Sequence, residues 1–237
     1  KQDTRNEKSA VSAGNNTLEN EFFRIKIDPK QGTIAEIYDK NTKQHIVPKG
    51  AQANLFQILY EESTGMSAWN LGQIMKTEDL TTPSEDSEIL EAGPTRALVR
   101  SEFDFRESSF VHDVMLYAGV PRIDVKLTAD WREVGKKDSG TIPMVKVAFP
   151  TTVQNPKASF EIPFGSIERP LNGDEVPAQK WIDLSGEDYG VSILNNCKYG
   201  HDVRDSTMRL SLLRASYYPD PTPDQEVHEI TYSIFPH

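Results

Sequence analysis

The sequence predicts an all-β protein, built as a large antiparallel β-sandwich. Apolar and polar residues alternate with a period of two in many segments, which is the pattern of strands buried on one face. No window shows a convincing helical period, and 15 prolines and 14 glycines punctuate the strand-like segments. Many short strands separated by turn signals are typical of a sandwich. The 237 residues suffice for one large domain of this kind.

The chain opens with a polar stretch, residues 1–17, whose composition predicts a linker or disordered lead-in. We therefore expect the folded domain to span residues 18–237. The first hairpin should follow at once, because apolar residues alternate with charged ones from Phe23 to Asp28. A turn at Gln31-Gly32 then leads into the return strand TIAEIYD.

Further strands are predicted in order along the chain. The clearest is residues 122–131, where five apolar residues alternate with five polar ones, as in an antiparallel strand wet on one face. The same alternation predicts strands over 97–105, 145–149, 208–212 and 230–234. The acidic segment 77–88 is interpreted as an exposed loop.

Composition excludes several kinds of partner. The net charge of −10 argues against nucleic acid and anionic membranes, which require a basic face. No apolar stretch has the length of a transmembrane helix. The single cysteine, Cys197, excludes an intrachain disulfide and is typical of a reducing compartment, so we expect a cytoplasmic location. We expect Cys197 itself to be a small buried residue rather than a nucleophile.

Neither a metal site nor a catalytic carboxylate can be assigned. The five histidines lie too far apart in sequence for the i, i+2 or i, i+4 spacing of metal ligands. Retaining glycosidases use two carboxyls about 5 Å apart, but with 36 acidic residues such pairs are uninformative. We therefore predict no metal and no catalytic residue in this chain.

Four separated motifs nevertheless resemble one family. They are the opening strands of residues 18–42, EIPFGSIERP at 161–170, PAQKWIDLS at 177–185, and the long run at 189–221. Together they resemble the C-terminal β domain of the retaining α-mannosidases of glycoside hydrolase family 38. The resemblance implies a β-supersandwich similar to galactose-mutarotase-like domains. It also implies that the zinc site and the nucleophile lie in an N-terminal catalytic domain absent from this chain.

The resemblance points to Arg214 as a contact to substrate. Strand alternation places Arg214 at the end of the apolar face formed by Met208, Leu210 and Leu212. In the family, an arginine at the end of the corresponding strand faces the active site, where its planar fork can bind sugar hydroxyls or a carboxylate. The alternative is a structural salt bridge to a nearby aspartate, Asp220 or Asp224.

Four other residues are candidates for substrate binding. Trp69 offers a flat apolar face to a sugar ring, and Asn70 follows it where relatives often carry aspartate. The alternative for Trp69 is a plug of the core beneath its loop. Tyr199 and Asp202 lie in CKYGHDVRDST (197–207), interpreted as a polar hairpin loop beside the Arg214 strand. The alternative there is a solvated turn.

Three functions follow as hypotheses. The first is an accessory β domain of an α-mannosidase, with its own catalytic domain and mannose-containing glycans as partners. The second is a stand-alone carbohydrate-binding module. The third is a mutarotase-like enzyme in which a histidine and a glutamate act as acid and base. The first predicts an exposed apolar patch near Arg214, because that face would pack against the catalytic domain.

Overall fold

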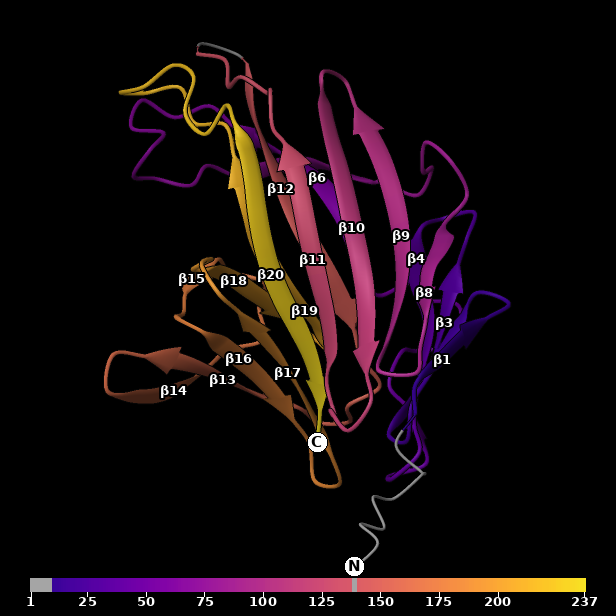
Figure 1. The fold of residues 1–237 in the computed structure, drawn as a ribbon. Helices are drawn as coiled ribbons and strands as arrows, with labels where there is room; N and C mark the ends of the chain where they lie inside the picture. The colour runs from indigo at the N-terminus through magenta and orange to yellow at the C-terminus, as the bar shows by residue number, and fades with distance from the viewer. Residues whose placement is uncertain (1–9, 138–139) are drawn as a thin grey trace, which may run out of the picture.

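The computed structural model describes residues 10–137 and 140–237, and within them every regular element is a β-strand. The strands form three antiparallel sheets (Figure 1). This confirms the predicted all-β sandwich. No helix in the described ranges could cross a membrane.

The largest sheet has nine strands and its members run in the order β14-β13-β16-β17-β20-β11-β10-β9-β8. Their bounds are β8 Glu88–Ala92, β9 Arg96–Phe105, β10 Ser108–Tyr117, β11 Ile123–Asp130, β13 Lys157–Ile162, β14 Gly165–Arg169, β16 Trp181–Ser185, β17 Gly190–Asn195 and β20 Val227–Pro236. The six-stranded sheet runs β15-β18-β19-β12-β6-β7. Its strands are β6 Leu55–Glu62, β7 Ile74–Asp79, β12 Thr141–Pro150, β15 Val176–Pro177, β18 Gly200–Arg204 and β19 Thr207–Arg214.

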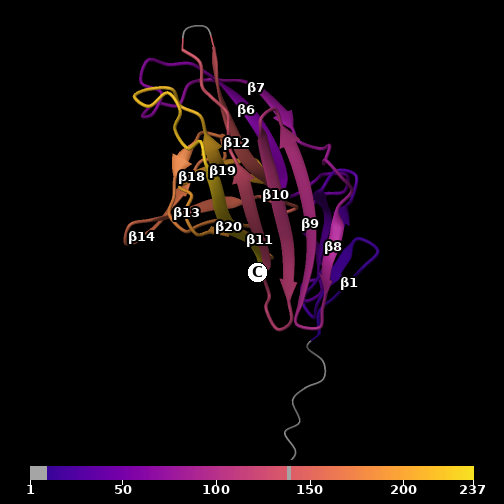
Figure 2. The same cartoon turned by 45° about the horizontal axis from the view of Figure 1, so that its top comes forward.

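These two sheets lie face to face with the core between them (Figure 2). Strand β11 shows the principle: its apolar residues Ile123, Val125 and Leu127 are fully buried, whereas Lys126 and Thr128 are half-buried on the other face. Strand β12 departs from it, because residues 142–149 are all buried. Its second face is covered as well, and this burial includes Lys146.

A third, five-stranded sheet packs beside β8 and β9 and contains β1 Ser12–Gly14, β2 Thr17–Glu19, β3 Phe23–Asp28, β4 Thr33–Asp39 and β5 Gln44–His45. The predicted hairpin of β3 and β4 is present. Gly32 in its turn has a φ of +65°, and a Cβ there would lie 2.5 Å from the Phe103 ring. Glycine is therefore required by both the backbone and the packing.

The predicted lead-in needs a correction. Residues 1–9 lie outside the described residues, but the rest of the segment is structured. Val11 is buried, its N–H bonds to Pro94 O, and β1 pairs with β2. A Cβ on Gly93 would lie 1.9 Å from the Val11 carbonyl oxygen, so the two backbones are in close contact. Strand β1 was not predicted because the segment is mostly polar and only Val11 beside it is buried.

Three local predictions were also wrong. Residues 77–79 end β7, so the exposed loop begins only after Asp79. Most of 197–207 is not a loop, because Gly200–Arg204 forms β18 and pairs with β19. Cys197 is exposed rather than buried. Polar residues in or beside a strand have the composition of a loop, and a small residue such as cysteine is compatible with either core or surface.

Candidate functional site

Arg214 ends β19, and a β-bulge decides which way its side chain points. In the pairing of β12 with β19, Val145 faces Leu213 but Lys146 faces Ser211, so Leu212 is an extra residue. One extra residue reverses the alternation beyond it. Arg214 therefore shares the outer face of the six-stranded sheet with Ser211, and not the apolar core face that strict alternation predicts.

On this face Arg214 is held by four hydrogen bonds. Its Nε and Nη2 donate to the two carboxylate oxygens of Glu61 at 2.7 Å each. Nη1 donates to Ser67 O at 2.5 Å and Nη2 to Asn70 O at 3.0 Å. Glu61 is fully buried, whereas the Arg214 side chain is 22% exposed. A salt bridge therefore exists, but its partner is Glu61 on β6 rather than either aspartate named from the sequence.

A pocket of about 330 Å³ opens at Arg214, and we call it the Arg214 pocket. Its walls come from loop 69–71, from the end of β19, and from the start of β18. Its lining residues are Trp69, Asn70, Leu71, Met144, Glu175, Gly200, Ser211, Leu212, Leu213, Arg214 and Asp224. The structure thus brings Arg214 together with Trp69 and Asn70, which lie more than 140 positions earlier in the chain.

Trp69 is not a core plug, because 62% of its surface is exposed. Its ring lies 6.2 Å from that of Tyr218, centroid to centroid. Met66, Leu71 and Tyr199 are also large, exposed and hydrophobic. Loop 63–73 and the 216–226 loop carry most of this apolar surface beside the pocket, at the same end of the sandwich (Figure 1). The predicted apolar patch near Arg214 therefore has side chains to form it.

Tyr199 and Asp202 have opposite environments. Tyr199 is 57% exposed and precedes Gly200 in the pocket wall. Asp202 is fully buried, and its oxygens accept bonds from Lys146 Nζ at 2.5 Å and Arg209 Nε at 2.7 Å. Asp202 reaches the pocket only through Lys146, which also pairs with Glu175.

Glu175 and Glu61 were missed by the sequence reasoning. Glu175 lines the pocket, pairs with Lys146 and accepts a bond from Ser211 Oγ at 2.5 Å. Glu61 anchors Arg214. One signal was available, namely Lys146 within the apolar run of β12, because a lysine there requires a carboxylate partner.

The described histidines belong to no metal-binding group, and two of them lie in the core. Within the described ranges no three His, Cys, Asp or Glu side chains are arranged to hold a metal ion. His112 is buried among Phe56 and Phe103 and bonds Asn54 at 2.8 Å. Burial lowers the pKa of both His112 and His201 to about 4. Both are therefore neutral core residues, which removes the support for a mutarotase-like acid and base.

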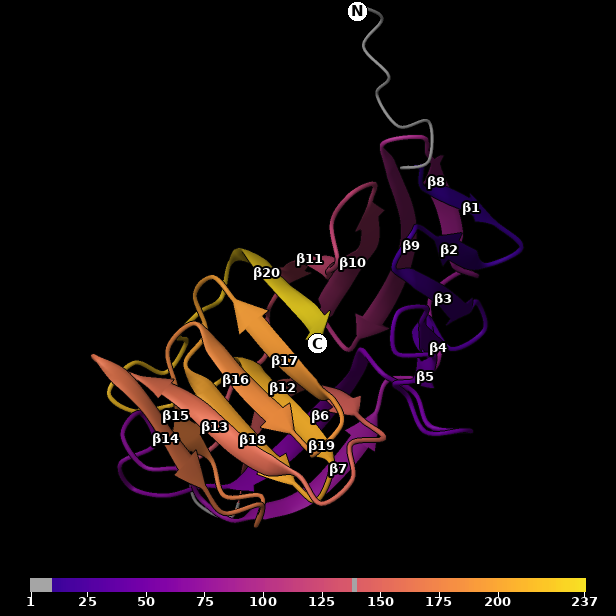
Figure 3. The same cartoon turned by 90° about the horizontal axis from the view of Figure 1, so that it is seen from below.

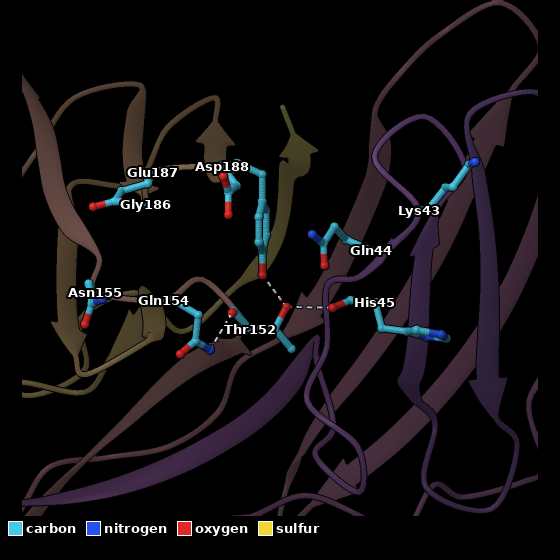
Figure 4. A pocket seen from close by; sticks show the side chains of 10 residues that line it. Lys43, Gln44, His45, Thr152, Gln154, Asn155, Gly186, Glu187 and Asp188 are labelled. Carbon is cyan, nitrogen blue, oxygen red and sulfur yellow. Dashed lines mark hydrogen bonds between the residues drawn. The ribbon is translucent and has the colours of Figure 1, made fainter.

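Another pocket, of about 420 Å³, lies between the five-stranded sheet and the sandwich (Figure 4). Lys43, Gln44 and His45 face loop 186–189 across it. The Tyr189 hydroxyl contacts Thr152 Oγ1, which donates to His45 O at 2.6 Å and so links the two sides. Burial raises the pKa of Tyr189, although its bond to Thr152 opposes that shift. None of the five residues chosen from the sequence lies here.

Comparison with known proteins places this chain in a family. The family model of the glycosyl hydrolases family 38 C-terminal domain matches residues 18–222. "Alpha-mannosidase 2C1" of Mus musculus is 31% identical over 236 residues, which are 94% of this chain and 22% of that protein. "Alpha-mannosidase G" of Dictyostelium discoideum is 30% identical over 240 residues, or 95% and 21% respectively. The chain thus spans about a fifth of the length of these curated relatives.

Solved structures agree on the fold. An α-mannosidase from Enterococcus faecalis V583 superposes with a TM-score of 0.76 at 16% identity, covering 96% of this chain and 30% of that one. A galactose mutarotase-like protein from Lactobacillus casei gives a TM-score of 0.51 at 13% identity, with 93% and 99% covered. The predicted supersandwich is therefore confirmed. The chain belongs to the glycosyl hydrolase family 38 C-terminal domain family.

Proposed function

We propose that this chain is the accessory β domain of an α-mannosidase that hydrolyses terminal α-mannosides. The relatives that match over its length are named α-mannosidases, and this chain aligns with 22% and 21% of their lengths. The remaining length has room for a catalytic domain, which would supply the nucleophile and a divalent metal, zinc in this proposal. The single exposed cysteine supports a cytoplasmic location for the enzyme.

The Arg214 pocket is the part of this domain that would face the catalytic domain. Trp69, Met66 and Tyr218 expose half or more of their surfaces beside it. Exposed aromatic and apolar groups gathered at one end of a domain are typical of an interface. Their burial against a second domain would place Arg214 at the boundary, where it forms part of the cleft wall.

Arg214 is suited to contact a hydroxyl or carboxylate there. A guanidinium has five N–H groups, and within the described part of the chain the four bonds to Glu61, Ser67 and Asn70 leave one on Nη1. The four bonds fix the group, so the remaining donor is preorganised. This fixed and partly exposed guanidinium is the observation that carries the proposal.

The test uses kinetics of the full-length enzyme. Arg214→Ala should lower kcat on an aryl α-mannoside about ten- to a hundredfold, because a charged hydrogen bond contributes about 1.5–3 kcal/mol. Arg214→Lys should recover only part, since the fork geometry is lost. Arg100→Ala is the matched control, because Arg100 makes a similar paired contact with Asp113 on the nine-stranded sheet.

Two results would count against the proposal. Unchanged kcat in a folded Arg214→Ala enzyme would limit Arg214 to a structural ion pair. Turnover of the α-mannoside by the isolated 237-residue chain, at a rate independent of purification, would show that the chemistry does not need a second domain.

A further inference from the structure

The outer face of the nine-stranded sheet carries a further pocket, of about 710 Å³, which we call the Trp181 pocket. It lies over β14, β13, β16, β17 and β20, which run side by side in Figure 3. Its lining residues are Val120, Pro121, Arg122, Ser159, Ser166, Trp181, Asp183, Ser192, Leu194, Phe235 and His237.

The strand register shows that these side chains form two adjoining rows. Trp181 lies opposite Leu194 across β16 and β17, which gives an apolar row. In the next row Asp183 lies opposite Ser192, which in turn lies opposite Phe235. The intervening residues of the same strands, such as Ile193, point into the core. The pocket therefore pairs an aromatic surface with a line of polar groups, and the sheet itself fixes both.

An ion pair and a hydrogen-bonded carboxylate border the aromatic surface. Arg122 donates from Nε and Nη2 to Asp124 at 2.6 and 3.0 Å, and its Nη1 makes no hydrogen bond within the described part of the chain. Asp183 Oδ1 accepts from Ser192 Oγ at 2.6 Å and lies 2.8 Å from His237 Nε2. The His237 ring stacks on Phe235 at 5.8 Å.

The charge balance indicates a neutral ligand. Arg122 is neutralised by Asp124, and Asp183 has its oxygens occupied by hydroxyl and imidazole groups. The Arg122 charge is thus paired, and the Asp183 oxygens already contact two hydroxyls and the His237 ring, so neither group is left free to hold an anion or a cation. An indole and a phenyl ring provide flat apolar faces. Flat faces bordered by fixed donors match the C–H face and the hydroxyl edge of a sugar ring.

The Trp181 pocket is separate from the Arg214 pocket. Trp181 lies on the outer face of the nine-stranded sheet, and Arg214 on the outer face of the six-stranded sheet, with the core between them. A catalytic domain packed at the Arg214 pocket would therefore leave the Trp181 pocket on the opposite side of the sandwich.

We propose that the Trp181 pocket binds a neutral hexopyranose unit of a glycan, with the ring on Trp181 and Phe235 and a hydroxyl on Arg122 Nη1. The site would retain a glycan at a distance from the chemistry and does not depend on the α-mannosidase proposal.

The test follows the fluorescence of the 237-residue chain carrying Trp69→Phe. Because Trp131 is fully buried, the response then comes from Trp181. Methyl α-mannoside and mannotriose are titrated, with mannose 6-phosphate as the charged probe. We expect saturable binding with a Kd near 1 mM, tighter for the trisaccharide, and no gain from the phosphate. In a chain that retains Trp69, followed by calorimetry, Trp181→Ala should weaken binding about tenfold or more.

Arg122→Gln gives a second variant; Asp124 keeps its bond from Ser233 Oγ and can accept from the new amide, and the melting temperature is measured alongside. It should weaken binding about three- to tenfold while the melting temperature is kept. Binding that survives in both folded variants, or that is lost with Arg214→Lys instead, would overturn the proposal. No saturable binding of either neutral probe up to 50 mM would overturn it as well, and tighter binding of the phosphate would overturn the neutral-ligand assignment.

Discussion

Replacement of Arg214 with alanine should destabilise this chain by about 3–5 kcal/mol, because it leaves a buried carboxylate without its cation. Glu61 is fully buried, and both of its oxygens accept from Arg214 at 2.7 Å. Among the described residues, the Gly72 N–H at 2.6 Å is then the one remaining hydrogen-bond donor to that carboxylate. The carbonyls of Ser67 and Asn70 would lose their donor too, so loop 63–73 should loosen.

The effect is large relative to the total stability of a domain, which is about 5–15 kcal/mol. For a chain of this length, 1 kcal/mol corresponds to roughly 2–4 °C in melting temperature, so a fall of roughly 6–20 °C is expected. Urea unfolding measures the free energy, and calorimetry measures the melting temperature. Arg100→Ala should change stability by only about 1 kcal/mol, because Arg100 and Asp113 are more exposed.

A double variant tests the cause. Glu61→Leu combined with Arg214→Ala should be more stable than Arg214→Ala alone by at least about 1 kcal/mol, because no charge is then left unpaired. A melting temperature of Arg214→Ala within 2 °C of the parent would refute this account of the pair. It would also be refuted if the free-energy losses of the two single variants simply added in the double variant.

Three further predictions concern stability. His112 and His201 have pKa values lowered to about 4 from 6.5 by burial, so the unfolded chain takes up protons first on acidification. The free energy of unfolding should thus fall from about pH 6.5 toward pH 4, by about 2 kcal/mol per histidine at pH 5. Urea unfolding at several pH values measures it, and a flat profile from pH 7 to 5 would contradict the prediction. Lys146→Met should lower the free energy of unfolding by about 3 kcal/mol, because Lys146 pairs with two carboxylates. Arg209→Met should lower it by less, because Arg209 pairs with Asp202. Equal losses in the two variants would count against this explanation. Gly93→Ala should lower it by more than about 2 kcal/mol because the new Cβ meets the Val11 carbonyl at a φ of +101°, and a neutral result would show that residues 11–14 are not fixed to the domain.

The fold was predictable because its signal is local and repeated. Ile123 to Asp130 alternates so regularly that the strand and its buried face follow from the residues themselves. The opening strand was missed for the opposite reason. Residues 12–14 form a short strand of the small residues Ser, Ala and Gly. They are held by the neighbouring Val11 and by contact with the Gly93 backbone, which no local pattern reveals.

The candidate site was predictable only in part. Arg214 and Trp69 were named from the sequence, and the structure brings them to one pocket. The bulge at Leu212 that turns Arg214 outward could not be predicted, because the residue pattern of the strand gives no sign of it. Its partner Glu61 is more than 150 positions away, and any of 36 acidic residues could have filled that role. Asp202 was chosen as a polar loop residue, whereas pairing of β18 with β19 buries it. Long-range pairing, and not residue type, decides these positions.

The place of β20 in the largest sheet has a consequence for biosynthesis. It fills the gap between β17 and β11, and pairs Ile234 with Ile123 on one side and Ile193 on the other. Until the ribosome has released this segment, each half of the sheet presents an unpaired strand edge, and such edges recruit other chains. At typical synthesis rates of 5–20 residues per second, the β11 edge stays open for on the order of ten seconds. Protection of that edge by a chaperone is most valuable during this interval of translation.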